Sequence, residues 1–498
     1  MTKRQTTVLA VAAALIVLAI VGGFTWLLGA QTGHFLWSMA RISLISGPVA
    51  IVLGAVVGFV IQGIMGRDYW DISLLSGFGV AVLTFIVGQA FVVSYAIPHS
   101  MAQTTQVEEA EDLSFRQRVP FDVASAVSNR NLGATTGDAS GTVKALPAEG
   151  ENGTYTTTVI RRGMFKGYES TQTMTAPLYG STGAQNVAFC EFSDDAELRL
   201  GGLAPKNNLK RAIQWKTSPS TLIDSNDALV RCEDGTPMVY VPTTQLDSNV
   251  FLPKRVPGPV AVYNGSTGEL RIEEELETDL PLYPKSIAER QRESLTRSGS
   301  AADWFFRRSG FEDTSNDGDD PNGENRAEFG LADESGENQY FVTPLTARGS
   351  SSSIVALGTV DAAGELKAGE LRPYQVHTYP KGESRQANSA VASRITGEVL
   401  SGYRASGLKV FEVVPSEDNT WTATVGKEQS VLYRAVINPD GSIELFDNQG
   451  NTVAGEGQEP EEGSELKADK PLEDMSVDEL KQLGDDILEE LAARASTE

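Results

Sequence analysis

The chain has 498 residues, enough for about three domains, and its 41% hydrophobic content is typical of globular protein. The charge is unevenly distributed. The first hundred residues hold four basic and two acidic side chains, whereas the remainder holds 37 basic and 64 acidic ones. This distribution predicts a membrane segment followed by a large acidic segment in water. Because an acidic surface repels phosphate backbones, nucleic acid is excluded as a partner.

Three charge-free runs at the N-terminus, residues 8–30, 42–66 and 72–97, are candidate membrane spans. Each exceeds the roughly 20 residues that cross about 30 Å of hydrocarbon as a helix. We therefore predict a three-helix transmembrane anchor in residues 1–100. Buried core helices of a soluble domain are the alternative for all three runs. A cleaved signal peptide is a second alternative for the first run, because Lys3 and Arg4 precede it.

The few charges near the spans predict the topology. Lys3, Arg4 and Arg67 fall on one side of the membrane and Arg41 falls on the other. The positive-inside rule then places the N-terminus in the cytoplasm and most of the chain outside it, in a multi-pass protein of the cell membrane. Cleavage of the first run would leave the large segment outside as well. No Asp, Glu, Lys or Arg lies inside a run, which favours an anchor over a transporter.

Small residues within the second run predict close helix packing. Gly54 and Gly58 have the small-xxx-small spacing that lets two backbones approach each other. The partner is either another span of this chain or a second membrane subunit. Gln89 is the most polar group of any size within the spans.

The soluble part reads as α+β, because β-branched strand-like runs and helical runs mix without regular alternation. We expect antiparallel sheets packed against helices, arranged as extracytoplasmic modules. The expected boundaries are a juxtamembrane linker at 101–150, an α+β module at 151–300, a helix and Asp/Asn/Gly-rich linker at 301–334, a second module at 335–450, a disordered acidic linker at 451–475 and a C-terminal amphipathic helix at 476–495.

One local pattern recurs in residues 260–272, 356–366 and 435–445, where an apolar strand, a short turn containing Gly and a second strand follow one another. Each predicts a β-hairpin whose glycine adopts a positive φ. Duplication of one α+β module would explain the recurrence, and so would independent convergence on common turn chemistry.

Cys190 and Cys232 are the only cysteines of the chain. In an oxidising exterior an even pair predicts one disulfide. The bond would close a loop of 42 residues and stabilise the fold by about 3 to 4 kcal/mol in the chain-entropy model. Two buried free thiols are the alternative, and they would favour a body that faces the cytoplasm.

An acidic segment between the modules resembles a calcium-binding loop in its spacing. Asp313, Ser315, Asp317 and Glu324 occupy positions 1, 3, 5 and 12 of an EF-hand-like loop. An aspartate and a proline at the eighth and ninth places depart from the pattern. The segment is therefore either a solvated linker or a calcium site, and calcium is the one cofactor that we consider.

Catalytic patterns are scarce. His377 is the only histidine within the modules, and its alternating context is that of an ordinary strand residue. Ser406 and Lys409 have the spacing of a Ser-x-x-Lys dyad without its accompanying motifs. Nucleotide-binding and zinc-protease motifs are absent from the sequence. Arg348 and the serines that follow it read as a loop, with an anion site as the alternative. We expect a protein without enzymatic activity.

The last residues predict a helix that needs a partner. Ser476 and Glu479 have the spacing of a capping box. One apolar stripe at helical spacing then contains Leu480, Leu483, Ile487, Leu488 and Leu491. A lone helix of this length is marginal in water. The stripe either docks on another chain, as a helix in a groove or in a coiled coil, or packs on its own body.

The sequence therefore predicts a non-enzymatic scaffold or assembly component of a cell-envelope complex, which contacts the membrane and other envelope proteins through its spans and its C-terminal helix. Self-association is compatible with the same surfaces. The alternative is a membrane-tethered module that senses a ligand or an ion outside the cytoplasm. The small amount of chain expected in the cytoplasm argues against a sensor.

Overall fold

The computed structural model describes residues 12, 15–20, 22–23 and 31–455, apart from short internal segments. Those segments are residues 67–68, 110–112, 132–137, 140–142, 150–151, 162–164, 166, 177–184, 197, 201, 203–207, 219–220, 250–251, 314–328, 334, 337, 350–352, 383, 400–406, 417–419, 428–429 and 448–449.

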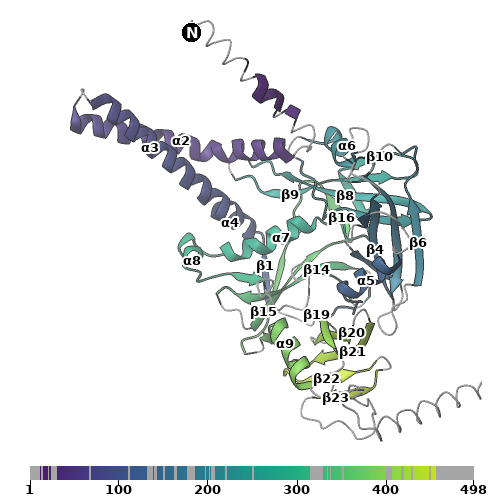
Figure 1. The fold of residues 1–498 in the computed structure, drawn as a ribbon. Helices are drawn as coiled ribbons and strands as arrows, with labels where there is room; N and C mark the ends of the chain where they lie inside the picture. The colour runs from purple at the N-terminus through teal and green to yellow at the C-terminus, as the bar shows by residue number, and fades with distance from the viewer. Residues whose placement is uncertain are drawn as a thin grey trace, which may run out of the picture.

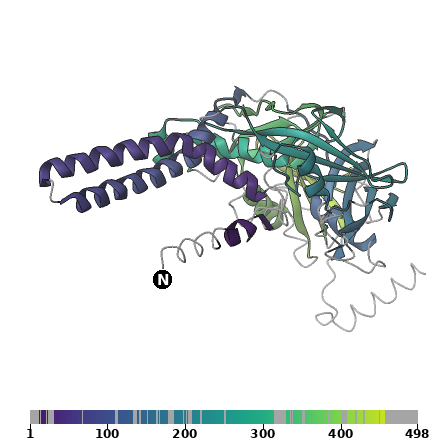
Figure 2. The same ribbon diagram turned by 90° about the horizontal axis from the view of Figure 1, so that it is seen from above.

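Two long antiparallel helices form a hairpin that projects from the rest of the molecule, as Figures 1 and 2 show. The first helix, α2, spans Gln31–Met65, and the second, α3, spans Trp70–Phe91. The chain turns near Gly66, whose φ of 86° suits a residue without a Cβ. α3 continues through the π-helical turn η2 (Val92–Ala96) into α4 (Ile97–Ala102), so one uninterrupted helical rod enters the body of the protein.

The segments Met39–Met65 and Trp70–Ala102 are long and apolar enough to cross a membrane, by length and composition. They coincide with the second and third predicted spans. Most of the first predicted span, residues 8–30, lies outside the described residues. The fold is thus mixed α+β with antiparallel sheets and two helices that could cross a membrane.

The largest sheet lies at the centre of the body, in the order β1-β17-β15-β14-β12, with β13 also paired to β14 and β18 to β15. β1 runs parallel to β17, and the other pairs of this sheet are antiparallel. Its strands are β1 (Gln106–Glu109), β12 (Phe311–Asp313), β13 (Phe329–Ala332), β14 (Gln339–Ala347), β15 (Ser353–Asp361), β17 (Gln375–Thr378) and β18 (Arg385–Gln386).

The segment expected to be a linker, residues 101–150, is instead part of the folded body. It contributes β1 to the central sheet, the helix α5 (Phe121–Asn131) and the strand β3 (Val143–Glu149). Val119, Val123 and Val127 are buried in one core cluster with residues of β3 and β4. These three valines recur at a spacing of four, which is the helical signal that the linker assignment overlooked.

Three further sheets follow. Two belong to the first half of the body, the residues before 301, and the third joins this half to the second half, the residues after 334. One has the order β2-β4-β5-β6 with β3 on β4, one has the order β10-β9-β8-β7, and β11 pairs with β16. Their remaining strands are β2 (Asp138–Ala139), β4 (Asn152–Arg161), β5 (Tyr168–Ala176), β6 (Gln185–Glu191), β7 (Leu229–Glu233), β8 (Thr236–Leu246), β9 (Arg255–Asn264), β10 (Leu270–Glu273), β11 (Glu275–Thr278) and β16 (Gly364–Lys367).

A C-terminal sheet of five antiparallel strands follows in simple sequence order from β19 to β23. Its strands are β19 (Lys409–Pro415), β20 (Trp421–Lys427), β21 (Ser430–Ile437), β22 (Ile443–Phe446) and β23 (Thr452–Gly455). The helices of the body beyond α5 are α6 (Leu209–Lys216), α7 (Lys285–Ser294), η4 (Leu295–Arg297), α8 (Ala301–Phe305), α9 (Asn388–Arg394) and η7 (Ile395–Val399).

The two predicted modules share one hydrophobic core. Leu282, Tyr283 and Ile287 of the first half are buried in the same cluster as Leu345 and Val376 of the second. Backbone hydrogen bonds between β11 and β16 join the halves again. The boundary expected near residues 301–334 is therefore not a boundary of the core.

Two of the three predicted hairpins form as expected. Residues 260–272 make the antiparallel pair β9–β10, and residues 435–445 make the pair β21–β22. Residues 356–366 do not form a hairpin, because β16 pairs with β11 and not with β15. A long-range partner from the first half has replaced the local one.

Candidate functional site

The hairpin is held together by backbone contact between small residues. A Cβ added to Gly54 would lie 2.5 Å from the carbonyl oxygen of Gly77 and 2.7 Å from the Cβ of Ala81 in α3. One added to Gly58 would lie 3.3 Å from the carbonyl oxygen of Ser73, whose hydroxyl donates to the carbonyl of Gly58. The structure thus places both glycines against α3 of the same chain, where close packing suits helices in lipid.

Polar groups of the hairpin face inward and apolar groups face outward. Gln89 donates from Nε2 to the hydroxyls of Ser43 (3.0 Å) and Ser46 (2.7 Å) on α2. Large apolar side chains on the outer surface of the hairpin are more than two thirds exposed, among them Ile51, Ile64, Leu75 and Phe78. An apolar belt around a helix pair without inner charges is the surface that a lipid bilayer covers.

The domain end of α2 is tied to the body by one arginine. Arg41 donates from Nη1 to the carbonyl oxygen of Asp247 (3.0 Å) and from Nη2 to that of Asn249 (2.6 Å). Both acceptors lie in the loop that follows β8. The charge that the topology argument placed alone on the outer side is therefore in contact with the body.

The rod formed by α3 and α4 is tied to the body by a second set of contacts. Arg297 donates from Nε to the carbonyl oxygen of Ser94 (3.0 Å), and His99 Nδ1 donates to the carbonyl oxygen of Arg297 (2.6 Å). The Tyr95 hydroxyl donates to the carbonyl oxygen of Gly299 (3.0 Å). Burial lowers the pKa of Arg297. The hairpin and the body are thus joined at two places.

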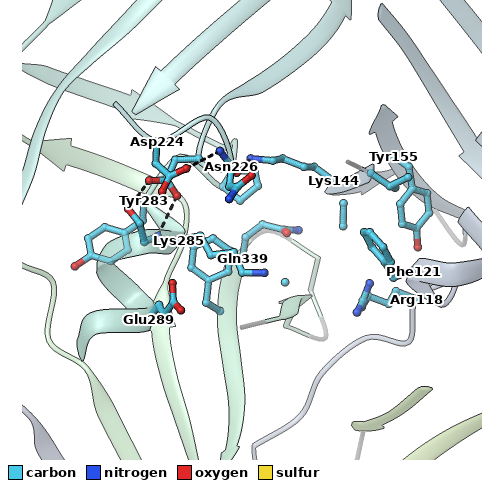
Figure 3. Close-up of a pocket in the computed structure, with 17 residues that line it drawn as sticks. Arg118, Phe121, Lys144, Tyr155, Asp224, Asn226, Tyr283, Lys285, Glu289 and Gln339 are labelled. Carbon is cyan, nitrogen blue, oxygen red and sulfur yellow. Dashed lines mark hydrogen bonds between the residues drawn. The ribbon is translucent and has the colours of Figure 1, made fainter. Parts of the chain in front are cut away.

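A cavity of about 330 Å³ opens where the two halves of the body meet. Residues from β3, the loop before β7, α7, α5 and β14 line it. Figure 3 shows Asp224, Lys285 and Glu289 along one side and Arg118 on the other. The volume falls in the range of small-ligand pockets, and both signs of charge face it.

Two ionisable groups of the cavity have shifted protonation equilibria. Burial lowers the pKa of Lys144 to about 8, although the negative charge of Asp227 opposes the shift. Burial raises the pKa of Asp227, while hydrogen bonds from the amide (3.0 Å) and the hydroxyl of Ser286 oppose that change. Lys144 also donates to the carbonyl oxygen of Asn226. Both shifts favour the neutral form, as expected for charges withdrawn from water.

The far wall of the cavity rests on a buried ion pair. Arg118 bonds Glu412 of β19 at 2.5 Å, and their side chains are 9% and 3% exposed. The Tyr155 hydroxyl donates to the carbonyl oxygen of Val119 (3.0 Å), and burial raises its pKa. The ion pair therefore joins the cavity wall to the C-terminal sheet. Removing either partner would leave a buried charge without a partner.

The two cysteines form a disulfide in the structure. Cys190 of β6 is bonded to Cys232 of β7, with their Cα atoms 5.5 Å apart. The bond joins the edge of the sheet that contains β4 and β5 to the sheet that contains β8 and β9. Neither cysteine lines the cavity, and the bond connects two sheets of the first half.

Asp313, the first position of the proposed calcium loop, is the last residue of β12 and pairs with Arg292 of α7. Their side chains are 8% and 9% exposed. Ser315, Asp317 and Glu324 lie outside the described residues. Within the described part of the chain, no group of three or more His, Cys, Asp or Glu side chains could hold a metal ion. Calcium binding at this loop stays a prediction.

The remaining candidates fall at separate places. His377 is buried in β17, where a hydrogen bond of 3.0 Å joins its Nε2 to the Thr359 hydroxyl, and burial lowers its pKa. Arg348 donates from Nη1 to the carbonyl oxygens of Thr296 and Trp304 (2.9 Å each), so it braces the chain around α8. Ser406 lies outside the described residues, and so does the apolar stripe of the C-terminal helix, Leu480, Leu483, Ile487, Leu488 and Leu491.

No protein-family model, curated protein or solved structure matches this chain. The site must therefore be argued from geometry. Sequence reasoning missed the cavity and both sets of hairpin contacts. The available signals were isolated arginines such as Arg41 and Arg297 in otherwise unremarkable contexts, and neither residue indicates its acceptor, which lies more than 200 positions away.

Proposed function

We propose that this protein is an integral membrane protein whose body lies outside the cytoplasm, and that it acts as a non-enzymatic scaffold or assembly component of a cell-envelope complex. The observation that carries the proposal is the rigid junction between hairpin and body. α3 enters the body as a continuous rod, and Tyr95 and His99 bond this rod to the turn at residues 297–299. Arg41 of α2 bonds the loop that follows β8.

A rigid junction favours a scaffold over a flexibly tethered binding domain. Because these contacts hold the body in one orientation relative to the hairpin, its surfaces keep a fixed orientation relative to the membrane anchor. A component around which several proteins assemble must hold its binding surfaces in fixed orientations. The topology follows the positive-inside argument from Lys3, Arg4, Arg67 and Arg41. The disulfide between Cys190 and Cys232 is compatible with an oxidising exterior.

The proposed docking element is the C-terminal helix with its apolar stripe. Burial of each stripe residue would contribute on the order of 1.5–3 kcal/mol. An acidic opposite face would steer the helix toward a basic groove. Replacing Leu483 and Ile487 with Asp should release a co-purifying chain after extraction in mild detergent, while the disulfide and the membrane location are kept.

The control is Trp215→Asp, which introduces one aspartate at an exposed apolar residue of α6. This variant should retain every co-purifying chain. In spheroplasts, added protease should digest residues beyond about 100 in all variants. Retention of all partners by the double variant would refute docking through the helix, and protection from protease would reverse the topology.

A second candidate is an exterior ligand-binding module, which the cavity favours. Lys144, Lys285 and Arg118 face it together with Asp224 and Glu289. A small molecule that carries both a carboxylate and an amine would find partners of opposite charge on the two sides. Binding at the cavity is compatible with a scaffold, since a ligand at the meeting of the two halves would stabilise the assembled body by mass action.

A further inference from the structure

Two consecutive aromatic side chains are exposed at the end of α8. Phe305 is 73% exposed and Phe306 is 60% exposed, and their rings pack edge to face with centroids 5.2 Å apart. Two arginines follow them, and the guanidinium of Arg308 lies over the Phe306 ring, 5.0 Å from its centroid. We refer to residues 304–308, Trp-Phe-Phe-Arg-Arg, as the aromatic-basic loop. A water-exposed pair of this kind marks a surface that contacts something apolar.

The loop is held in place although its tip is exposed. Ser300 caps α8 through a capping box with Asp303, and Arg348 donates to the carbonyl oxygen of Trp304 (2.9 Å). Arg307 has φ 53°, a left-handed conformation that is unfavourable for a residue with a side chain. Its guanidinium bonds Glu312 at 3.2 Å. The protein therefore accepts local backbone strain to present both phenylalanines outward.

The loop lies beside the point at which α3 would leave the hydrocarbon. Asp71 is charged and lies near the tip of the hairpin, so the hydrocarbon segment of α3 begins at about Ile72. Twenty residues, the length that spans the hydrocarbon, end at about Phe91. Tyr95 is four residues further along, or about 6 Å. Because the headgroup layer of one leaflet is roughly 5–8 Å thick, Tyr95 falls within it.

Trp304 shares this depth, because its ring packs on Tyr95 with centroids 5.3 Å apart. Figure 1 shows α8 at the edge of the body next to α4, on the side from which the hairpin projects. Phe305 and Phe306 directly follow Trp304. Aromatic rings are enriched at this level of a membrane because one part of the site is apolar and another part is wet.

We propose that the aromatic-basic loop docks on the surface of the lipid bilayer, with Phe305 and Phe306 in the interface and Arg307 and Arg308 against anionic headgroups. The loop is continuous with the apolar hairpin, and its positive charge complements an anionic leaflet. This inference rests on the proposed membrane anchoring. It adds a third contact to those of α2 and α3, so the tilt of the body relative to the bilayer is restricted.

The experiment uses the full chain in vesicles, with one fluorophore per variant. The two native cysteines are bonded to each other, which leaves an introduced cysteine as the reactive thiol. The labelled positions are Phe306→Cys in the loop, Leu83→Cys on the exposed middle of α3, and Phe165→Cys between β4 and β5, in the sheet whose strand β4 lies away from the hairpin in Figure 1. The vesicles contain phosphatidylcholine with phosphatidylglycerol, and a nitroxide is placed at the headgroup or deep in the acyl chain.

We expect the headgroup nitroxide to quench the label at position 306 and the deep nitroxide to quench the label at position 83, with neither quenching position 165. Adding Arg307→Glu and Arg308→Glu should reduce quenching at position 306 to the level of position 165, whereas Arg307→Lys and Arg308→Lys should keep it. Omitting phosphatidylglycerol should weaken quenching at position 306 alone.

Quenching at position 83 without quenching at position 306 would overturn the docking of the loop and leave the membrane anchor intact. Absence of quenching at position 83 would instead refute membrane spanning, and with it the proposed function on which this inference rests.

Discussion

The two halves of the body contain a similar series of local elements and use them for different partners. In the first, β8, β9 and β10 are followed by β11, by residues 283–285, Tyr-Pro-Lys, and by α7, which begins at Lys285. In the second, β14, β15 and β16 are followed by β17, by residues 379–381, again Tyr-Pro-Lys, by β18 and by α9. Pro242 and Pro344 lie in the corresponding long strands, each next to or near a shift in register.

The tyrosines show how close the parallel is. Tyr283 and Tyr379 are both buried, and each lies under a guanidinium, Arg372 at 5.6 Å and Arg385 at 4.9 Å from the ring centroids. Burial raises the pKa of Tyr379 to about 12 and raises that of Tyr283 as well. Because Arg372 and Arg385 come from different places in the chain relative to these tyrosines, the recurrence is compatible with duplication and with convergence.

The third strand is where the halves differ. β10 folds back on β9 of its own half, whereas β16 pairs with β11 of the other half. Arg372 of the second half lies over Tyr283 of the first. The first half contacts α4 through α7 and η4, and the second shares its core with the C-terminal sheet. A repeated element that loses its local partner can thus become the joint between two units.

The largest expected effect comes from the disulfide, which the first half alone possesses. The double variant Cys190→Ala, Cys232→Ala should unfold with a free energy lower by about 3–4 kcal/mol, because the 42-residue loop is no longer closed in the unfolded chain. Urea titration in detergent, followed by tryptophan fluorescence, measures the change. Reduction of the wild type should produce a shift of the same size.

This variant also tests whether the halves are one cooperative unit. Because they share a core, both should unfold in one transition that moves to lower urea. Two separate transitions would show that the halves fold independently in spite of the shared core. Freely alkylated thiols at both positions in protein from native membranes would show that the disulfide does not form.

An intermediate effect is expected at the joint. Arg372 donates to the carbonyl oxygens of Asp361 (2.8 Å) and Ala363, which precede β16, and of Glu365 (2.6 Å), which lies in it. Arg372→Ala should lower the free energy of unfolding by about 2 kcal/mol, since hydrogen bonds from charged groups are the stronger ones. Amide exchange should increase in β11 and β16 while β9 and β10 stay protected.

The control for this prediction is Arg372→Lys, which keeps the charge and loses the planar fork of donors. Its free energy of unfolding should lie between those of the wild type and of the alanine variant. Equal increases of amide exchange in β10 and β16 would contradict the idea that Arg372 stabilises β16 and not β10.

The sequence predicted those parts of the fold that depend on neighbours along the chain. The turn of residues 264–268 follows from Asn264, whose side chain accepts from the amides of Ser266 and Thr267 (2.9 Å each), and from Gly268 with φ 78°. The helix after Ser300 follows from its capping box. Such interactions lie within a few residues and leave a recognisable pattern.

Features that depend on distant partners were not predictable from the pattern. β1 is a short polar strand whose partner β17 lies about 270 residues away, and Arg118 and Glu412 are separated by 294 positions. The cavity draws its lining from segments spread over more than 200 residues. Each segment looks ordinary alone, so a site assembled from them has no sequence signature.

The smallest expected effect is on the pH dependence of the free energy of unfolding. Two lysines where the halves meet, Lys144 and Lys367, should contribute to it differently. The pKa of Lys144 is lowered to about 8 by burial in the cavity. Between that value and about 10.5 the unfolded chain binds more protons than the folded chain, so this group makes the free energy of unfolding rise with pH. At pH 7 Lys144 is protonated in both the folded and the unfolded chain, so burial of its charge lowers the free energy of unfolding by the full amount.

Lys144→Met should therefore stabilise the protein at pH 7 by on the order of 1 kcal/mol, since loss of the bond to Asn226 offsets part of the gain. The advantage should shrink as pH rises from 8 to 10.5. The pKa of Lys367 on β16 is instead raised by hydrogen bonds to Glu365 and Glu275, so its contribution is present below 10.5 and is lost only above that pH. Lys367→Met should thus change stability by a constant amount over the same window. Thermal unfolding of both variants from pH 7 to 10.5 measures the contrast, and parallel curves for the two would show that the cavity leaves Lys144 as solvated as a lysine at the joint.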